Sequence, residues 1–247
     1  MIANSPNDIV LMKKAGEITK NTLEYAKSLI KAGISTLDLD KSIKKFIIDN
    51  NATPNFLGYQ GFPGSACISV NDVVVHGIPS SKIVLKEGDI VSIDVGVTYK
   101  GYNGDAARTF PVGKISVEKQ KLIDVTQQCF FEGISHLYVG GKLGELSNAI
   151  QKHAEKNGFS VVRELVGHGI GHELHEIPNV PNYGKETEGI TIPENIFLAI
   201  EPMINMGKRA IFLERDGWTV KTRDGLPSAH YENTVLVTSN GVEILTL

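Results

Sequence analysis

The sequence predicts an α/β fold made of two similar halves, each with two helices and a set of strands. Helical spacing of apolar residues gives way to short apolar strand runs, and this order occurs twice along the chain. Residues of the same type also recur at a constant offset of 107 positions, in the pairs Gly33 and Gly140, Leu39 and Leu146, Ile43 and Ile150, and Asn50 and Asn157. We therefore expect a single domain, 1–247, whose halves span roughly 1–115 and 116–247 and are related by a pseudo-twofold axis.

Two helices open the first half. The segment Ser5-Pro6-Asn7-Asp8 combines an N-cap serine, a proline at the first helical position and an acid three residues after the cap, and predicts a helix that ends at Gly33. A second helix is predicted from Thr36 to Asn50, where the helical spacing of apolar residues ends. Strand runs follow over 66–76 and 89–97.

The segment from Asp94 to Asp105 predicts a β-hairpin that carries two acids on one face. If Lys100-Gly101 is a two-residue turn, residue 94 opposes Ala107, and Asp105 lies two positions along at a diagonal distance of ~7–8 Å. Asp94 lies in an apolar run that should be buried, and buried acids need partners. We interpret both acids as ligands, with solvated acids on an exposed strand face as the alternative.

The second half repeats this order. Ser116 predicts the start of a helix through about Leu137, and another helix is predicted over 143–157. The offset of 107 also places Asp94 onto Glu201, each of which ends or interrupts an apolar strand run. The strands of both halves are expected to meet in one sheet with these carboxylates at the seam, although short apolar matches also arise by chance.

Composition excludes several classes of function. The chain has 28 acidic and 25 basic residues, a net charge of −3 and no long run of one sign, so it lacks the basic patch of a protein that reads nucleic acid or binds an anionic membrane. Its only cysteines, Cys67 and Cys129, form neither a disulfide framework nor a zinc knuckle, which indicates a reduced, cytoplasmic setting. The first residues lack a signal-peptide pattern, and no apolar run is long enough to cross a bilayer.

Five residues stand in apolar or glycine-rich contexts that suit metal ligands: Asp94, Asp105, His168, Glu201 and Glu232. Four carboxylates and one imidazole favour Mn²⁺, Fe²⁺ or Co²⁺ over the sulfur-rich settings of structural zinc. Two such ions ~3.5–4 Å apart can activate one hydroxide between them. This set predicts metal-dependent hydrolysis.

The densest histidine cluster lies over 167–176. It is not the helical His-Glu-x-x-His zinc motif, because the spacing differs and its three glycines argue against a helix. A strand or turn that brings His168 close to a metal fits better. A single histidine is more often structural, so His172 is a weaker candidate than His168 and His175.

Seven short motifs together resemble those of type I methionine aminopeptidases over essentially the whole chain: His76-Gly77-Ile78-Pro79, Ser92-Ile93-Asp94-Val95-Gly96, Gly104-Asp105, Gly167-His168-Gly169-Ile170-Gly171, His175-Glu176-Ile177-Pro178, Ile200-Glu201-Pro202 and Glu232-Asn233-Thr234. The resemblance implies the pita-bread α/β fold, with a central, mainly antiparallel sheet and helices outside. It also implies removal of the initiator methionine from nascent proteins whose second residue is small.

The resemblance assigns the metal ligands. Asp94 would hold one divalent cation, Asp105 and Glu232 would bridge both cations, and His168 and Glu201 would complete the other. It implies two ions per chain, drawn from Co²⁺, Mn²⁺, Fe²⁺ and Zn²⁺, a bridging hydroxide that attacks the first peptide carbonyl, and a proton relay through Glu201 to the leaving amine.

The resemblance also assigns the catalytic and substrate-binding residues. His175 would lie near the scissile carbonyl and His76 near the following amide, and both would stabilise the tetrahedral intermediate. The methionine side chain would occupy an apolar pocket formed by Phe56, Tyr59, Phe62, Cys67, Leu174 and Trp218, unless these are ordinary core residues. The resemblance further implies a structural monovalent cation near Asn71, Val73 and Ser228.

Several positions depart from the family pattern. Leu174 replaces a common aromatic residue, Phe62 a common tyrosine and Asn233 a common histidine. These changes affect the shape of the pocket and not the ligands. His172 and His230 are additional imidazoles near the site that could bind surplus metal.

Two other functions stay open. Proline-directed peptidases such as prolidase and aminopeptidase P share the five ligands, but they usually carry a further N-terminal domain. A relative without catalysis that binds protein or RNA would be expected to lose ligands, and this chain keeps all five. As partners we expect the N-terminal methionine of nascent polypeptides and transient contact with the ribosome, with no nucleic-acid reading, no membrane and a monomeric state.

Overall fold

A computed structural model describes all residues, 1–247. It contains four α-helices and one short 3-10 helix, with bounds α1 (Pro6–Leu29), α2 (Thr36–Asp49), η1 (Tyr59–Gly61), α3 (Val117–Ile134) and α4 (Leu143–Lys156). Fifteen strands complete the α/β fold that the sequence predicts. No helix combines the length and the apolar character needed to cross a membrane.

The strands pair antiparallel in four sheets. The first has β4 (Ile90–Tyr99) bonded to β1 (Thr53–Pro54), β2 (Cys67–Val70) and β5 (Tyr102–Pro111). The second has five strands in the order β15 (Gly241–Ile244), β14 (Asn233–Thr238), β9 (Ile196–Ile200), β7 (Gly167–Gly169) and β8 (Glu176–Val180). Two smaller sheets have the orders β13 (Ser228–His230), β10 (Met203–Asn205), β6 (Ser160–Val161) and β11 (Ile211–Leu213), β12 (Val220–Thr222), β3 (Val73–Val75).

The two helix pairs have the same kind of connection and the same kind of C-terminal cap. Gly33 and Gly140 both adopt a left-handed backbone, with φ of 92° and 88°. The C-cap residues Asn50 and Asn157 each donate from the side-chain amide to the carbonyl four residues earlier, at 2.8 and 2.9 Å. The offset found in the sequence therefore corresponds to a repeated local structure. The boundary between the halves at residues 115 and 116 stays a prediction.

The N-terminal helix confirms its predicted start but ends early. Ser5 and Asp8 form a reciprocal capping box ahead of α1. The helix ends at Leu29 instead of Gly33, because Ile30 is already extended. The predicted starts at Thr36, Ser116 and Leu143 are also confirmed.

The predicted hairpin has the expected register. Lys100 and Gly101 have φ of 49° and 81°, as a two-residue turn with a left-handed backbone at both positions requires. Asp94 pairs with Ala107, and Asp105 pairs with Gly96. Asp94 and Asp105 therefore share one face of the sheet.

The predicted strand over 66–76 is broken in two. Asn71 turns the chain between β2 and β3 with a φ of 52°. Its side chain donates to Asp89 at 2.8 Å and accepts from the amide of Ile90 at 3.1 Å, so these contacts stabilise the turn in place of ladder pairing.

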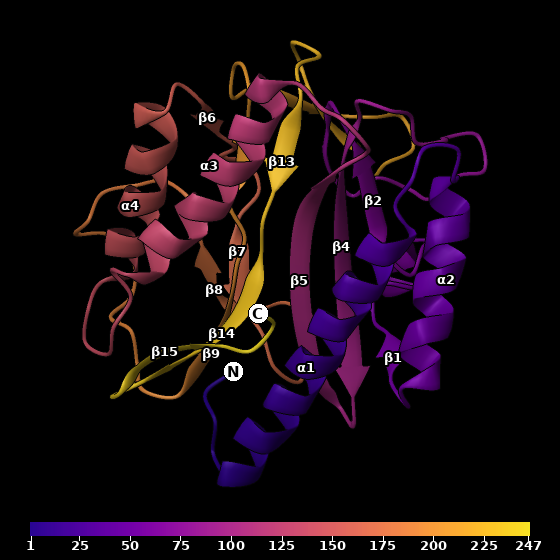
Figure 1. Cartoon of the computed structure of the whole chain (residues 1–247). Helices are drawn as coiled ribbons and strands as arrows, with labels where there is room; N and C mark the ends of the chain where they lie inside the picture. The colour runs from indigo at the N-terminus through magenta and orange to yellow at the C-terminus, as the bar shows by residue number, and fades with distance from the viewer.

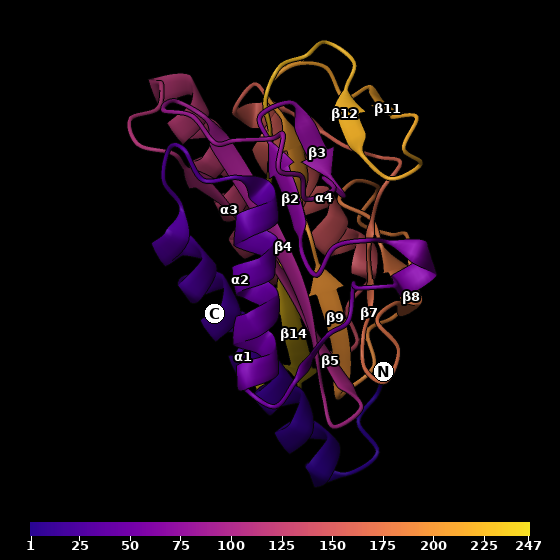
Figure 2. The ribbon, with the colours of Figure 1, turned by 90° about the vertical axis from the view of Figure 1, so that its right-hand side faces the viewer.

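Two large apolar clusters form the core. One packs α1 and α2 against β4 and β5, and the other packs α3 and α4 against β9, β10, β13 and β14. In Figure 1 the helix pair α3–α4 lies on the left and the pair α1–α2 on the right, with strands between and behind them. Figure 2 shows β7, β8, β11 and β12 on the side away from α1 and α2.

The two halves meet at β5. The sequence suggested one continuous sheet, whereas strand pairing divides the strands among four sheets. Ala107 and Glu232 link the halves just ahead of β14, where their main chains exchange hydrogen bonds at 3.4 and 2.9 Å, and the pairing of β3 with β12 links them a second time. The carboxylates lie at this seam, as expected.

Candidate metal centre

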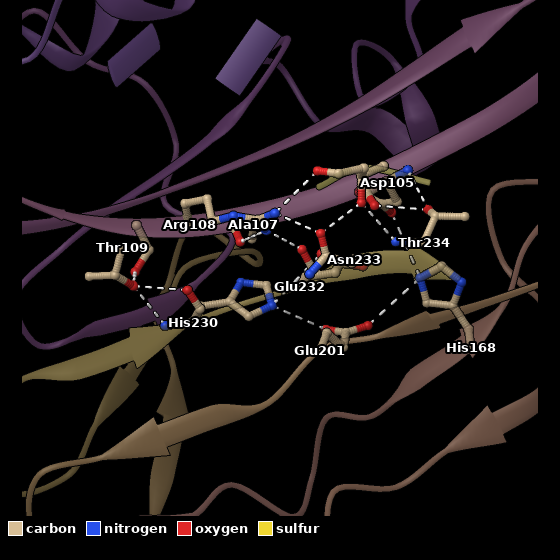
Figure 3. Close-up of polar contacts among 12 residues, drawn as sticks. Asp105, Ala107, Arg108, Thr109, His168, Glu201, His230, Glu232, Asn233 and Thr234 are labelled. Carbon is tan, nitrogen blue, oxygen red and sulfur yellow. Dashed lines mark hydrogen bonds and ion pairs between the residues drawn. The ribbon is translucent and has the colours of Figure 1, made fainter. Parts of the chain in front are cut away.

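The five predicted ligands converge from five strands. Asp94 lies in β4, Asp105 in β5 and His168 in β7, while Glu201 follows β9 directly and Glu232 precedes β14 directly. The His168 Nε2 atom lies 3.8 Å from Asp105 Oδ2 and 3.7 Å from Glu201 Oε1. Figure 3 shows His168, Asp105, Glu201 and Glu232 directed toward one another.

Two groups of side chains have ligand atoms within 4.8 Å of one another, close enough to hold a metal ion: Asp94, His230 and Glu232, and Asp105, His168 and Glu232. Glu232 belongs to both groups. One of the additional imidazoles that the sequence singled out, His230, is therefore part of the centre.

Four buried atoms of the centre have no hydrogen-bond partner: Asp94 Oδ1, Asp105 Oδ1, Glu232 Oε1 and His230 Nε2. An unpaired buried polar atom costs about 1–3 kcal/mol, and buried charges are normally paired or bound to metal. Carboxylate and imidazole donors suit divalent first-row cations. These residues therefore fit a metal site.

Burial sets the protonation of the acids. It raises the pKa of Asp94, Glu201 and Glu232 well above the ordinary values, and that of Asp105 to about 7. The neighbouring carboxylates raise the first three further by repulsion between like charges. A divalent cation reverses this balance, so its binding would release protons from the centre.

The imidazole of His168 is uncharged and can bind a metal ion through Nε2. Burial lowers its pKa to about 4, so the imidazole carries no charge near neutral pH. Its Nδ1 lies 2.8 Å from the carbonyl oxygen of Gly169. With Nδ1–H donating to that carbonyl, the Nε2 lone pair is directed at the carboxylates, as a metal-binding histidine requires.

One cavity of about 240 Å³ brings together all of the predicted site residues: Phe56, Tyr59, Phe62, Cys67, His76, Asp94, Asp105, His168, Leu174, His175, Glu201, Trp218 and Glu232. Five further residues line it that sequence reasoning missed: Gln60, Val75, Leu165, Val166 and Met203. Met203 opens β10 two positions after Glu201.

The two remaining predicted catalytic histidines lie on the cavity wall. His175 Nδ1 is 2.8 Å from the Tyr59 hydroxyl, and its ring centroid is 4.2 Å from that of His168. His76 lies edge-on to Trp218 at 6.1 Å and has a φ of 58°, a strained conformation typical of functional positions. Burial lowers the pKa of His175 and brings that of His76 to about 4, so both imidazoles are neutral.

The apolar part of the cavity suits an unbranched thioether. Phe62 and Trp218 meet edge to face with their centroids 5.1 Å apart. Cys67 is buried beside Asp94, and burial followed by the nearby carboxylates raises the pKa of its thiol, which stays protonated. Sulfur contacts with ring edges stabilise methionine in such surroundings.

Arg108 is a functional candidate that the sequence reasoning missed. Its guanidinium donates to the carbonyl oxygen of Glu232 and, at 2.6 Å, to Asn233 Oδ1, and it lies 4.2 Å from the centre of the Tyr231 ring. These contacts fix the segment that carries Glu232. The signal was an arginine directly after Ala106 and Ala107 in a predicted strand, because a partly buried cation needs partners.

Two further predictions concern His172 and the site of a monovalent cation. His172 is exposed, lies tilted against the Tyr102 ring with the centroids 4.5 Å apart and belongs to neither metal group. The main-chain carbonyl oxygen of Asn71 accepts a hydrogen bond from the amide of Ser228 at 2.9 Å. Two of the residues expected near a monovalent cation therefore lie together. The cation itself stays a prediction.

Comparison with known proteins places the chain among peptidases. Residues 10–239 match the model of metallopeptidase family M24. The chain is 53% identical over 247 residues to a methionine aminopeptidase of Clostridium perfringens, covering 100% of this chain and 99% of that protein.

Solved structures confirm the predicted fold. The crystal structure of methionine aminopeptidase from Rickettsia prowazekii superposes with a TM-score of 0.97 at 43% identity, and all of both chains is covered. Prolidase from Pyrococcus furiosus gives a TM-score of 0.79 at 23% identity, covering 100% of this chain and 65% of that one, which shows a shared fold alone.

Proposed function

This chain belongs to metallopeptidase family M24, and from that premise we propose that it is a methionine aminopeptidase that hydrolyses the first peptide bond of chains beginning with methionine. The observation that carries the proposal is that the acids of the centre and an apolar wall line one cavity of about 240 Å³. Such a cavity can hold one methionine side chain beside the bond to be cleaved.

The proposed centre holds two divalent cations. Asp94 would hold one, Asp105 and Glu232 both, and His168 and Glu201 the other. When bound, the cations supply an activated water and polarise the peptide carbonyl. Support for this assignment comes from the unpaired buried oxygens of Asp94, Asp105 and Glu232.

Protein groups would complete the hydrolysis. Glu201, which lies between His168 and His230, would accept a proton from the attacking water and deliver it to the leaving amine. If the Tyr59 hydroxyl donates to His175 Nδ1, the proton of the neutral ring lies on Nε2 and can be donated to the carbonyl oxygen as negative charge develops there. His76 would contact the following amide.

Further parts of the proposal rest on the sequence and on the family resemblance. These are the initiator methionine of nascent chains as substrate, a small second residue, a monomeric state, a cytoplasmic location, transient contact with the ribosome and a structural monovalent cation. The cellular metal would be one of Mn²⁺, Fe²⁺, Co²⁺ and Zn²⁺, since the donor set accepts each of them.

The test is release of the N-terminal residue by metal-stripped protein that is re-supplied with each of the four cations in turn. The substrates are Met-Ala-Ser, Met-Pro-Ser and Ala-Pro, and the matched control is a His172→Gln variant, which changes an exposed imidazole outside the cavity. We expect free methionine from both tripeptides. Cleavage of Ala-Pro alone would instead indicate a proline-directed peptidase, and no cleavage with any cation would contradict the proposal.

A further inference from the structure

His230 is an imidazole of the metal centre that the proposed hydrolysis does not use. It is buried, with 2% of its surface exposed, and it lies in β13 two residues before Glu232. Figure 3 shows His230 and His168 on opposite sides of Glu201, both directed toward it.

The contacts of His230 repeat those of His168. His230 Nε2 lies 3.6 Å from Glu201 Oε2 and 3.8 Å from Glu232 Oε2. The corresponding distances from His168 Nε2 are 3.7 Å to Glu201 Oε1 and 3.8 Å to Asp105 Oδ2. Both imidazoles therefore face two carboxylates at the same range.

The 3.8 Å between His230 Nε2 and Glu232 Oε2, the two atoms that would share an ion, suits a pair of metal ligands better than a hydrogen bond. Nitrogen and oxygen atoms that hydrogen-bond lie about 2.7–3.2 Å apart, so His230 Nε2 has no such partner. A nitrogen and an oxygen that bind the same cation lie about 2.0–2.2 Å from it. When the angle between these two bonds at the cation is about 110–130°, the nitrogen and the oxygen are roughly 3.4–3.8 Å apart.

The main chain holds His230 in place. The hydroxyl of Thr109 donates to the carbonyl oxygen of His230 at 2.9 Å and accepts from its amide at 2.9 Å. This contact ties β13 to β5, the strand that carries Asp105. The imidazole is thus positioned by the same seam that positions the carboxylates.

We propose that His230 is a metal ligand, binding through Nε2 the divalent cation that Asp94 holds, so that each of the two cations has one imidazole. Asp94, His230 and Glu232 then form one site, and Asp105, His168 and Glu232 the other. This inference rests on the two-cation centre proposed above and adds a sixth ligand to it.

The first test is calorimetric titration of the metal-stripped protein with Co²⁺. We expect two bound ions in the unaltered protein, and in His230→Gln at least a tenfold loss of affinity for one of them with the other little changed. His172→Gln is the matched control and should titrate like the unaltered protein. Equal affinities in His230→Gln and the unaltered protein would overturn the proposal.

The second test needs no variant and so does not depend on whether His230→Gln folds. In the protein loaded with Co²⁺, each ligating imidazole gives one strongly shifted N–H proton signal that disappears in deuterated water. Two such signals are expected, one from His168 and one from His230. A single signal would overturn the role of His230.

The outcomes separate this inference from the proposed function. Two bound ions with one shifted N–H signal would remove His230 from the centre and leave the proposed hydrolysis intact. Failure of the unaltered protein to bind Co²⁺ would overturn the two-cation centre and the role of His230 together.

Discussion

The main chains of Ala107 and Glu232 are joined by two hydrogen bonds, with the Glu232 amide 2.9 Å from the Ala107 carbonyl oxygen and the reverse pair at 3.4 Å. A second link lies beside it, where the Thr234 hydroxyl accepts from the amide of Asp105 and donates to its carbonyl oxygen, both at 2.9 Å. These contacts hold Asp105 and Glu232 beside each other. The packing of the two halves therefore fixes the positions of these two proposed ligands.

Asp94→Asn should weaken the binding of one cation and leave the fold intact. The amide keeps the shape of the side chain but removes a charge from the group that contains His230 and Glu232. Calorimetric titration with Co²⁺ measures the affinity of each site, and circular dichroism checks the fold. Two sites of unchanged affinity would contradict the assigned role of Asp94.

His76→Ala should lower kcat roughly 10²-fold without loss of metal, because the imidazole is expected to stabilise charge in the transition state and touches no cation. Hydrolysis of Met-Ala-Ser and Co²⁺ titration of the same preparation provide the two measurements. A loss of metal affinity that matches the loss of rate would show that His76 acts through the centre instead.

Tyr59→Phe should lower kcat about tenfold and change KM little. The variant removes the hydroxyl that lies 2.8 Å from His175 Nδ1, a contact of roughly 1–1.5 kcal/mol, and keeps the ring on the cavity wall. Steady-state kinetics at saturating metal separate the two parameters. A raised KM at unchanged kcat would mean that Tyr59 serves only to bind substrate.

The Asp105→Asn variant should stabilise the metal-free protein at high pH. Burial raises the pKa of Asp105 from 3.8 to about 7, so between these values the folded state binds more protons than the unfolded state. The stability of the metal-free protein therefore falls as pH rises through this window, and asparagine, which does not titrate, avoids the loss.

The difference in free energy of unfolding between Asp105→Asn and the unaltered protein should grow from pH 4 to pH 7, to a size on the order of a few kcal/mol, and then level off. Urea unfolding at several pH values in the presence of a chelator provides the measurement. With saturating Co²⁺ the order of stability should reverse, and a pH-independent difference would contradict the prediction.

Gly104→Ala should destabilise the protein by about 1–3 kcal/mol. A Cβ at this position would lie 2.6 Å from Thr19 Oγ1 and 3.0 Å from the main chain of Ala15, so α1 would have to move away from β5. Urea unfolding gives the loss, and metal affinity reports whether Asp105, the next residue, also moves. A loss below about 0.5 kcal/mol would mean that α1 adapts freely.

Short-range features could be predicted from the sequence because few residues determine them. The capping box of Ser5 and Asp8 requires only residues within one helical turn. The register that pairs Asp94 with Ala107 follows from the turn at Lys100 and Gly101. The five residues predicted as ligands, whose convergence the structure shows, were chosen from residue type, context and family resemblance.

Features that depend on contacts between the halves could not be predicted. Arg108 finds its partner Asn233 across the seam, and no local pattern links the two. The break between β2 and β3 depends on Asn71 meeting Asp89 and Ile90, which a run of apolar residues conceals. The position of His230 beside Glu201 likewise appears only once β13 and β9 are placed in space.

Glu232 belongs to both groups of potential ligands, so the loading of the two proposed ions would be thermodynamically linked. An ion at either position orders and charges a carboxylate that the other position also uses. By reciprocity, each ion changes the affinity of its neighbour by the same factor. The amount of singly loaded protein at limiting metal is therefore set by this cooperativity as well as by the intrinsic affinity of each position.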